Sequence, residues 1–361
     1  MKTLEQIYRS IDRFQRSFWN REAGLRPPVG VSIDGANTPI MFLKKKVAGA
    51  ELHPEDITGD FWYTDYDFIA CDRRVFSDDL MPFSAAWRAV PWLEAMCGCP
   101  VRCAHGSLAP GRCVESADAL RQWEIPAHNG WRERLNTITG ELVRSLPDDC
   151  FISPTILRGP SDIIAAMRGM EHFYLDLYDD IGAVREAAAR VNRLFFAVLE
   201  RHFAAVPPHH GGYVHVYGYW APGRTNVIQE DALGMCSPSV YRDVFMELNA
   251  DIVKRFGSCF FFHFHSTGFQ FWRDVMAIPG LAGIELTIEE NGPRLIGLAP
   301  VLREILERTR LILFVYHYFE DVREILKSIP HDGLYLIISD KFITSDDEYR
   351  AFIASVWDIF L

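Results

Sequence analysis

The sequence lacks the features that would connect it with nucleic acid or a membrane. Its 361 residues carry 37 Lys and Arg against 48 Asp and Glu, and no run of like charge is longer than Lys44-Lys45-Lys46. Because a phosphate backbone attracts clustered basic residues, we expect no nucleic-acid partner. The charged segment from Met1 to Arg16 has no apolar signal region, and the longest apolar runs, near 311–316, are far shorter than a membrane span. A cytoplasmic protein without a membrane partner is therefore expected.

Motifs of common cofactor and hydrolase sites are also missing. The sequence contains no GxGxxG, P-loop, GxSxG or HExxH pattern, so nucleotide-binding and hydrolase functions have no support. Of the eight cysteines only Cys97, Cys99 and Cys103 cluster, without a second CxxC pair. In a reducing compartment we expect these cysteines to be buried thiols, since a single cluster is a weak indication of a metal site.

The pattern after Cys150 predicts the fold. Short apolar runs alternate with single helical segments, which indicates parallel strands joined by right-handed crossovers. The predicted strands after Cys150 lie at 151–157, 213–217, 259–265, 283–287, 311–316 and 334–338, and two earlier ones lie at 29–33 and near 100–104. Eight such strands close naturally into a (β/α)8 TIM barrel, and a doubly wound open sheet is the alternative.

We expect one domain over residues 1–361. Residues 1–28 form a predicted N-terminal helical extension, because apolar residues recur there at helical spacing. Residues 36–98 form a predicted insertion rich in aromatic side chains. Such an insertion could serve as a lid or a wall facing a ligand, or it could pack against the barrel.

The predicted strand at 259–265 ends in two histidines. Alternation along a strand places His263 and His265 on the same side, and the carboxyl ends of parallel strands are where such folds carry their sites. Two core histidines bonded to neighbouring backbone are the alternative. Other predicted strand ends add polar residues, namely His215, Tyr217, Tyr219, Glu285, Glu289, Glu290, His317 and Asp340. Asp231 lies either beside these strand ends or at the end of a helix, where it is exposed to solvent.

This set of imidazoles and carboxylates could hold zinc or a similar cation, or it could form a metal-free acid/base site. We predict His265, Tyr217, Asp231 and Glu285 as catalytic residues. The predicted substrate-binding residues are His215, Tyr219, Trp92 and Arg158. The predicted metal ligands are His263, His265, His317 and Asp340.

Several motifs resemble the uroporphyrinogen decarboxylase superfamily. In chain order they are Ser153-Pro-Thr-Ile-Leu-Arg-Gly-Pro-Ser-Asp162, Met170-Glu171, Asp176-Leu-Tyr-Asp-Asp180, Asp231 with Cys236-Ser-Pro-Ser-Val-Tyr241, and His265-Ser-Thr-Gly268. The segment Pro91-Trp-Leu-Glu-Ala-Met-Cys-Gly-Cys-Pro100 is similar to the branch of corrinoid-dependent methyltransferases. The resemblance covers most of the chain from Pro91 onward and implies a (β/α)8 barrel, in agreement with the strand count.

The sequence departs from this family at two places. The decarboxylases have an N-terminal Met-Arg-Gln-Ala-Gly-Arg segment that grips substrate carboxylates, whereas this chain has Gly24-Leu-Arg-Pro-Pro28. The methyltransferase branch has His-x-Cys-Gly at this strand end, whereas Thr267 stands here at the position of the cysteine; alternatively, His263 and His265 form a His-x-His pair. Asp340 lies near the position of the family's late cysteine. A metal bound without thiolate ligands is a harder Lewis acid, and it suits an oxygen substrate or water better than a thiol.

The resemblance implies a methyltransferase that moves a methyl group between a small substrate and a corrinoid on a partner protein, with zinc assistance. A decarboxylase or lyase acting on a small carboxylic acid or a tetrapyrrole is the first alternative. It would use Arg158 or Arg224 to bind the carboxylate. A non-catalytic ligand-binding barrel is the second alternative, and a homodimer is among the assemblies we consider.

Overall fold

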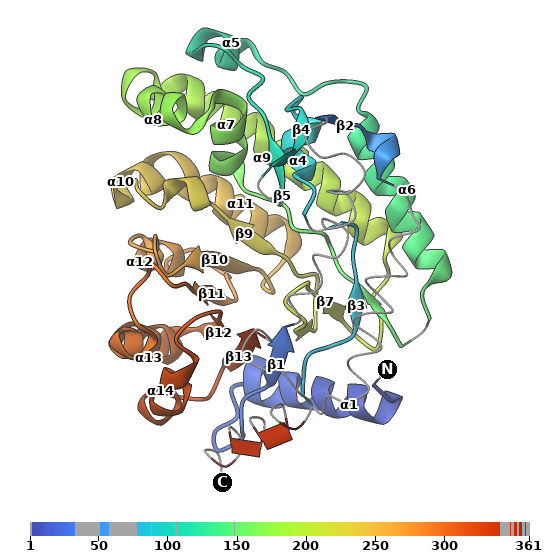
Figure 1. The fold of residues 1–361 in the computed structure, drawn as a ribbon, viewed down its shortest axis with the longest axis vertical. Coiled ribbons are helices and arrows are strands. Elements are labelled where there is room, and N and C mark those ends of the chain that lie inside the picture. The colour runs from blue at the N-terminus through green and yellow to red at the C-terminus, as the bar shows by residue number, and fades with distance from the viewer. Residues whose placement is uncertain are drawn as a thin grey trace.

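The computed structural model describes residues 2–32, 51–57, 78–87, 89–104, 107–147 and 149–339, with a few positions between 347 and 358. Its centre is a six-stranded parallel sheet in the order β1-β13-β12-β11-β10-β9 (Figure 1). The strands are β1 (Val29–Ser32), β9 (Val227–Gln229), β10 (Phe261–His265), β11 (Gly283–Ile288), β12 (Arg310–Val315) and β13 (Leu334–Ser339). The predicted α/β class with a parallel sheet is therefore present.

Helices connect these strands and cover the outer face of the sheet. In Figure 1 they lie on the left, beside the strands. They are α10 (Pro238–Val240), α11 (Met246–Phe256), α12 (Trp272–Met276), α13 (Ala299–Arg308) and α14 (Val322–Ser328). Phe262 on β10 points toward them and meets Tyr241 and Phe271 edge-on, at 5.9 and 6.0 Å between ring centres. Each such buried ring contributes about 1.5–3 kcal/mol to folding.

The N-terminal segment packs against the other, inner face of the sheet. Helix α1 (Leu4–Arg13) begins at a capping box in which Thr3 accepts a hydrogen bond from the Gln6 amide, and a π-helical turn, Phe14–Trp19, follows. Phe18 stacks on Phe261 with 5.7 Å between ring centres. The first helix therefore covers one end of the apolar core that lies inside the curved sheet.

A second group of helices makes up the upper part of Figure 1. They are α4 (Trp92–Met96), α5 (Ala117–Gln122), α6 (Gly130–Ser145), α7 (Pro160–Arg168), α8 (Met170–Asp179) and α9 (Ile181–Ala205). Helices α7 and α8 are separated at Gly169, where φ is 81°. An L side chain is strained at such a φ, which glycine adopts freely. A buried ion pair joins the two pieces, with Arg168 Nε and Nη2 at 2.6 and 3.2 Å from the Asp176 carboxylate.

Three predicted strands lie outside the six-stranded sheet. The strand expected at 151–157 is shortened to β6 (Phe151–Ile152), which pairs in parallel with β3 (Phe83–Ser84). The other two belong to antiparallel sheets. The strand expected near 100–104 is β4 (Val101–Ala104), which pairs antiparallel with β2 (Glu51–Leu52) and β5 (Ser107–Pro110). The strand expected at 213–217 is β7 (Tyr213–Val214), which pairs antiparallel with β8 (Trp220–Ala221). Both predictions of a place in the parallel sheet were wrong, because tight local hairpins take these residues. Strand β9 was missed because three residues show no periodic pattern.

Backbone hydrogen bonds continue from both edges of the sheet. The Asp79 amide donates to Val29 O at 2.7 Å, and the Gly159 amide donates to Gln229 O at 2.8 Å. Between these segments, β3 (Phe83–Ser84) pairs in parallel with β6 (Phe151–Ile152). Most of the predicted aromatic insertion lies outside the described residues. The sequence pattern also predicts a closing helix at 346–360, and most of these positions lie outside the described residues as well. No helix in the described part of the chain is both long and apolar enough to cross a membrane.

Candidate functional site

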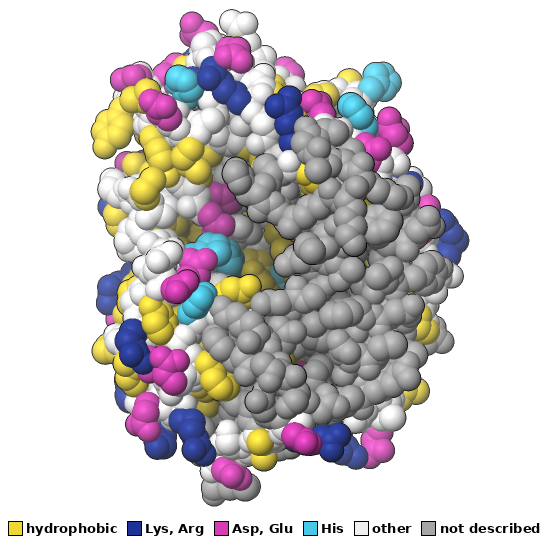
Figure 2. Space-filling model, viewed as in Figure 1, with side chains coloured by type: hydrophobic (Ala, Val, Ile, Leu, Met, Phe, Trp, Pro, Cys, Tyr) yellow, Lys and Arg dark blue, Asp and Glu magenta, His cyan; other side chains and the backbone are white. Residues whose placement is uncertain are grey.

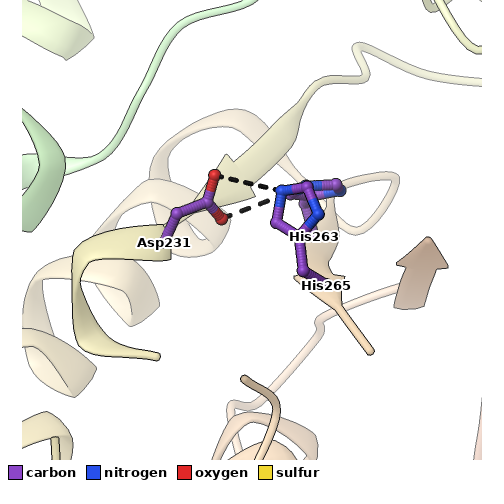
Figure 3. A group of neighbouring side chains, drawn as sticks. All are labelled: Asp231, His263 and His265. Atoms are coloured by element: carbon purple, nitrogen blue, oxygen red, sulfur yellow. Dashed lines mark hydrogen bonds and ion pairs between the residues drawn. The ribbon is translucent and has the colours of Figure 1, made fainter. Parts of the chain in front are cut away.

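Three side chains at the carboxyl ends of neighbouring strands converge on one point. Asp231 follows β9, and His263 and His265 end β10 (Figure 3). One ligand atom from each residue lies within 4.8 Å of the others. The two Nε2 atoms are 3.0 Å apart, and Asp231 oxygens lie 3.3 Å from His265 Nε2 and 3.9 Å from His263 Nε2.

The register of the sheet explains this convergence. His263 pairs with Glu285 on β11 and with Gln229 on β9. Paired residues in adjacent parallel strands point to the same face of the sheet, so the side chains of His263, Glu285 and Gln229 all face inward. Phe262 and Phe264 face the helices instead, where they contact Phe271. Alternation of Phe and His in β10 thus divides one strand between the apolar core and the site.

A second layer of polar groups holds the two imidazoles. His263 Nδ1 is hydrogen-bonded to Glu285, whose other oxygen accepts a bond from Thr287 Oγ1 at 2.9 Å. Tyr217 Oη lies 3.2 Å from the same His263 nitrogen. His265 Nδ1 is 3.0 Å from Glu289 Oε1, close enough for charge attraction although the two groups are not aligned as a hydrogen bond. Both rings therefore have a carboxylate behind them, and their Nε2 atoms are directed toward Asp231 and toward each other.

Burial and neighbouring charge oppose each other at this site. Burial disfavours the charged form of His263, but the charge and hydrogen bond of Glu285 outweigh it and raise the pKa of His263 to about 9. Burial would raise the pKa of Asp231, but the hydrogen bond from His265 and the charge of His263 lower it to about 2. In the absence of a metal, the group is thus an aspartate facing imidazolium.

Two buried acids support the turn that carries Asp231. Asp162 accepts a hydrogen bond from the Ala232 amide at 2.6 Å, and Glu230 accepts bonds from the Ser161 amide and Asn249 Nδ2, both at 2.8 Å. Burial raises the pKa of Glu230 to about 7. Asp162 was not among the site residues predicted from the sequence. Asp162 lies in the first turn of a helix, directly before Ile163 and Ile164. An acidic residue next to apolar residues in this position is an indication that its carboxylate is buried against a partner.

The histidines line a cavity of about 350 Å³. Tyr217, Phe314 and Tyr316 contribute aromatic walls, and Arg158 and Glu94 contribute a charged one. Glu94 is buried, with 1% of its side chain exposed, and its carboxylate is 3.0 Å from Arg158 Nη1. Figure 2 shows histidine and acidic side chains side by side near the middle of this face. Glu94 was not singled out from the sequence, although an acid within an apolar helical turn is an indication of a buried partner.

Other residues predicted for the site lie elsewhere. His215 is buried with Nε2 3.1 Å from Asn226 Oδ1, and Tyr219 is buried with its hydroxyl 2.8 Å from Thr225 Oγ1. Trp92 is 1% exposed, and its indole donates to Trp87 O at 2.9 Å. These three side chains belong to the packed interior and do not line the cavity. His317 follows β12 and contacts Tyr316 and Tyr318, and among the described residues the convergent group does not include it. Asp340 lies outside the described residues.

Asp231, His263 and His265 fit the requirements of a catalytic zinc or similar cation. Nitrogen and carboxylate oxygen are its usual ligands, and three protein ligands leave one position for water or substrate. Metal-bound histidines commonly have a carboxylate on the second ring nitrogen, as Glu285 provides for His263. The donor set is thus compatible with a metal, and it contains no thiolate.

Comparison with known proteins gives a fold and no family. No family model matches the sequence, and no curated protein does. The structure is similar to that of a methyltransferase from Methanosarcina mazei, with a TM-score of 0.61 over 93% of this chain and 94% of that chain. The two sequences are 14% identical, so this likeness establishes a shared fold.

Proposed function

We propose that the protein is a methyltransferase of the uroporphyrinogen decarboxylase-like superfamily, which moves a methyl group between a small substrate and a corrinoid carried by a partner protein. The observation that carries this proposal is the position of the Asp231, His263 and His265 group beside a cavity, in a fold shared with a methyltransferase. The ordered motifs between Pro91 and Gly268 support the same superfamily.

The proposal includes a closed (β/α)8 barrel. Support comes from the backbone bonds at the two edges of the six-stranded sheet, Asp79 to Val29 and Gly159 to Gln229, and from the parallel β3 and β6 pair between them. The carboxyl ends of barrel strands form one mouth, which is where the site and its cavity lie.

Each residue of the site has a task in this function. Asp231, His263 and His265 would hold the metal, which when bound supplies a Lewis acid that polarises the heteroatom giving or receiving the methyl group. Glu285 keeps His263 oriented, and Glu289 attracts His265. The Tyr217 hydroxyl, next to His263 on the cavity wall, can hold or deliver a proton. Arg158 can bind an anionic part of the substrate.

The purified protein, prepared without a His tag, is expected to contain close to one zinc or similar ion per chain. Metal analysis by mass spectrometry measures this directly, and adding zinc to the chelated protein should raise its melting temperature, because a ligand that binds the folded state stabilises it. No bound metal after purification in supplemented buffer, together with no thermal shift, would remove the metal from the proposal.

Methyl transfer is expected to appear as a change in the absorbance spectrum of cobalamin. The purified protein is mixed with methylcobalamin and small oxygen, nitrogen or sulfur acceptors, and with reduced cobalamin and methyl donors. Conversion should depend on the protein and on zinc, and it should be absent from the His265→Ala variant. Unchanged spectra with every donor and acceptor, combined with release of carbon dioxide from a small acid, would contradict methyl transfer.

A decarboxylase or lyase is the second candidate, because Arg158 faces the cavity with 38% of its side chain exposed. A guanidinium in that position can bind a substrate carboxylate. The carbon dioxide measurement above distinguishes this function from methyl transfer.

A further inference from the structure

Three cysteines outside the candidate site gather where the β4–β5 hairpin meets α4. Burial raises the pKa of the Cys97 thiol, and the nearby sulfur of Cys113 adds to the shift. Cys99 Sγ and Cys113 Sγ lie 3.5 Å apart, although the two residues are separated by 14 positions in the sequence. The sequence groups Cys97 with Cys99 and Cys103, whereas the structure places Cys99 beside Cys113.

The hairpin brings these two cysteines together. Val101 pairs with Pro110 at the open end of the hairpin, so Cys99 and Cys113 lie just beyond the ends of the two strands. The Gly111 amide donates to Pro100 O at 2.7 Å, which extends the pairing toward the cysteines. The Cys113 amide donates to Met167 O at 3.0 Å. The backbone on both sides of the sulfur pair is therefore held in place.

The two sulfurs differ in exposure and acidity. Cys99 is buried at 2% exposure, whereas Cys113 is partly exposed. The hydrogen bond between the two thiols lowers the pKa of Cys113, and burial partly opposes this effect. The same hydrogen bond, together with burial, raises the pKa of the Cys99 thiol. A partly exposed cysteine of lowered pKa with a second thiol beside it is the arrangement of an oxidisable cysteine and its resolving partner.

We propose that Cys99 and Cys113 are an oxidation site at which a hydroperoxide converts the two thiols into an intrachain disulfide. The Cys113 thiolate attacks an oxygen of hydrogen peroxide and becomes a sulfenic acid as hydroxide leaves. The Cys99 sulfur then attacks the sulfenic sulfur, loses its proton, and displaces a second hydroxide. Two thiols are oxidised to one disulfide, and one hydrogen peroxide is reduced to two waters. The sulfurs must approach from 3.5 Å to about 2.05 Å, which needs only a small adjustment of the two side chains.

The crosslink connects the cavity wall with a neighbouring element. The Cys99 amide donates to Glu94 O at 3.0 Å, and Glu94 is the residue whose carboxylate holds Arg158. Cys113 is bonded to Met167, in the last turn of α7. A disulfide would therefore tie the segment that carries Glu94 to the end of α7.

Peptide mapping of the full chain tests the proposal. The reduced protein is treated with one equivalent of hydrogen peroxide, and the remaining thiols are then blocked under denaturing conditions. We expect the number of free thiols to fall by two from the eight of the sequence, and a peptide that joins Cys99 to Cys113 to appear. Dithiothreitol should reverse both changes. The Cys150→Ser variant is the matched control, since it removes another buried thiol and should leave the crosslink unchanged.

Two results would overturn the proposal. One is a crosslink that joins other cysteines, including Cys97 to Cys99 or Cys97 to Cys113. The other is oxidation of Cys113 to sulfinic acid, or eight unreacted thiols, without the crosslink. In the Cys99→Ser and Cys113→Ser variants the peptide should disappear, but the mapping of the unmodified chain decides the question even if either variant fails to fold.

Discussion

The His265→Ala variant is expected to lose bound zinc and methyl transfer while the metal-free protein keeps its fold. His265 is one of three predicted ligands, so its removal should weaken zinc affinity by at least ~100-fold, more than the loss of an outer partner of a ligand. Its side chain is 34% exposed, and its polar neighbours are Asp231, Glu289 and His263. The free energy of unfolding of the metal-free protein should therefore change by at most ~1 kcal/mol.

Zinc titration and urea unfolding of the chelated protein measure these two quantities. The His172→Ala variant is a suitable control, because it changes a histidine on α8 outside the convergent group. The His317→Ala variant separates the three-residue group from the larger ligand set predicted from the sequence, since zinc should be retained if His317 is not a ligand. If His265→Ala keeps its zinc and instead loses ~2 kcal/mol or more of stability, His265 is a core histidine.

The metal-free protein is expected to become less stable as the pH rises from about 6 to about 9.5. The pKa of His263 is about 9 in the folded chain, against 6.5 for an ordinary histidine. The stabilisation from its charged form is complete below the unfolded pKa and is lost as the pH rises through the folded pKa, an effect of about 3 kcal/mol. The pKa of His265 is also raised, so it acts in the same direction.

Urea unfolding of the chelated protein across this range tests the expectation. The Glu285→Gln variant keeps the shape of the side chain but removes the charge that raises the pKa of His263, so its stability should depend much less on pH. Zinc requires neutral imidazoles, and its affinity should therefore rise with pH over the same interval. A stability of the metal-free protein that is constant or increases with pH would contradict the proposed charge state of His263.

Long apolar runs made much of the sheet predictable. Strands β10 to β13 bury nearly every residue, and such strands read as continuous hydrophobic segments. The pairing of β4 and β7 was not predictable in the same way, because a short apolar run carries no information about its neighbour. The separation of α7 from α8 at Gly169 depends on one backbone angle, for which a glycine within a helical pattern gives only a weak indication.

The sequence predicted that His263 and His265 lie on the same side of their strand, since alternation alone determines it. The closeness of Asp231 depends on β9, a three-residue strand that was not recognised. His215, Tyr219 and Trp92 were predicted for the site because they are polar or aromatic near expected strand ends or the insertion. In the structure their polar atoms are bonded to Asn226, Thr225 and Trp87 instead. Whether a polar residue faces a cavity or the core depends on partners that are distant in the chain.

The packing of the N-terminal helix has a consequence for the order in which the chain can fold during synthesis. Strand β1 pairs with β13, and Arg310 Nη2 donates to Trp19 O across 291 residues of sequence. While the ribosome is still translating the middle of the chain, β1 and the apolar face of α1 have no partner in the parallel sheet. The segment 4–32 thus emerges long before its partners and is among the last to be completed, and the nascent chain carries an unpaired strand edge that is open to aggregation or to a chaperone.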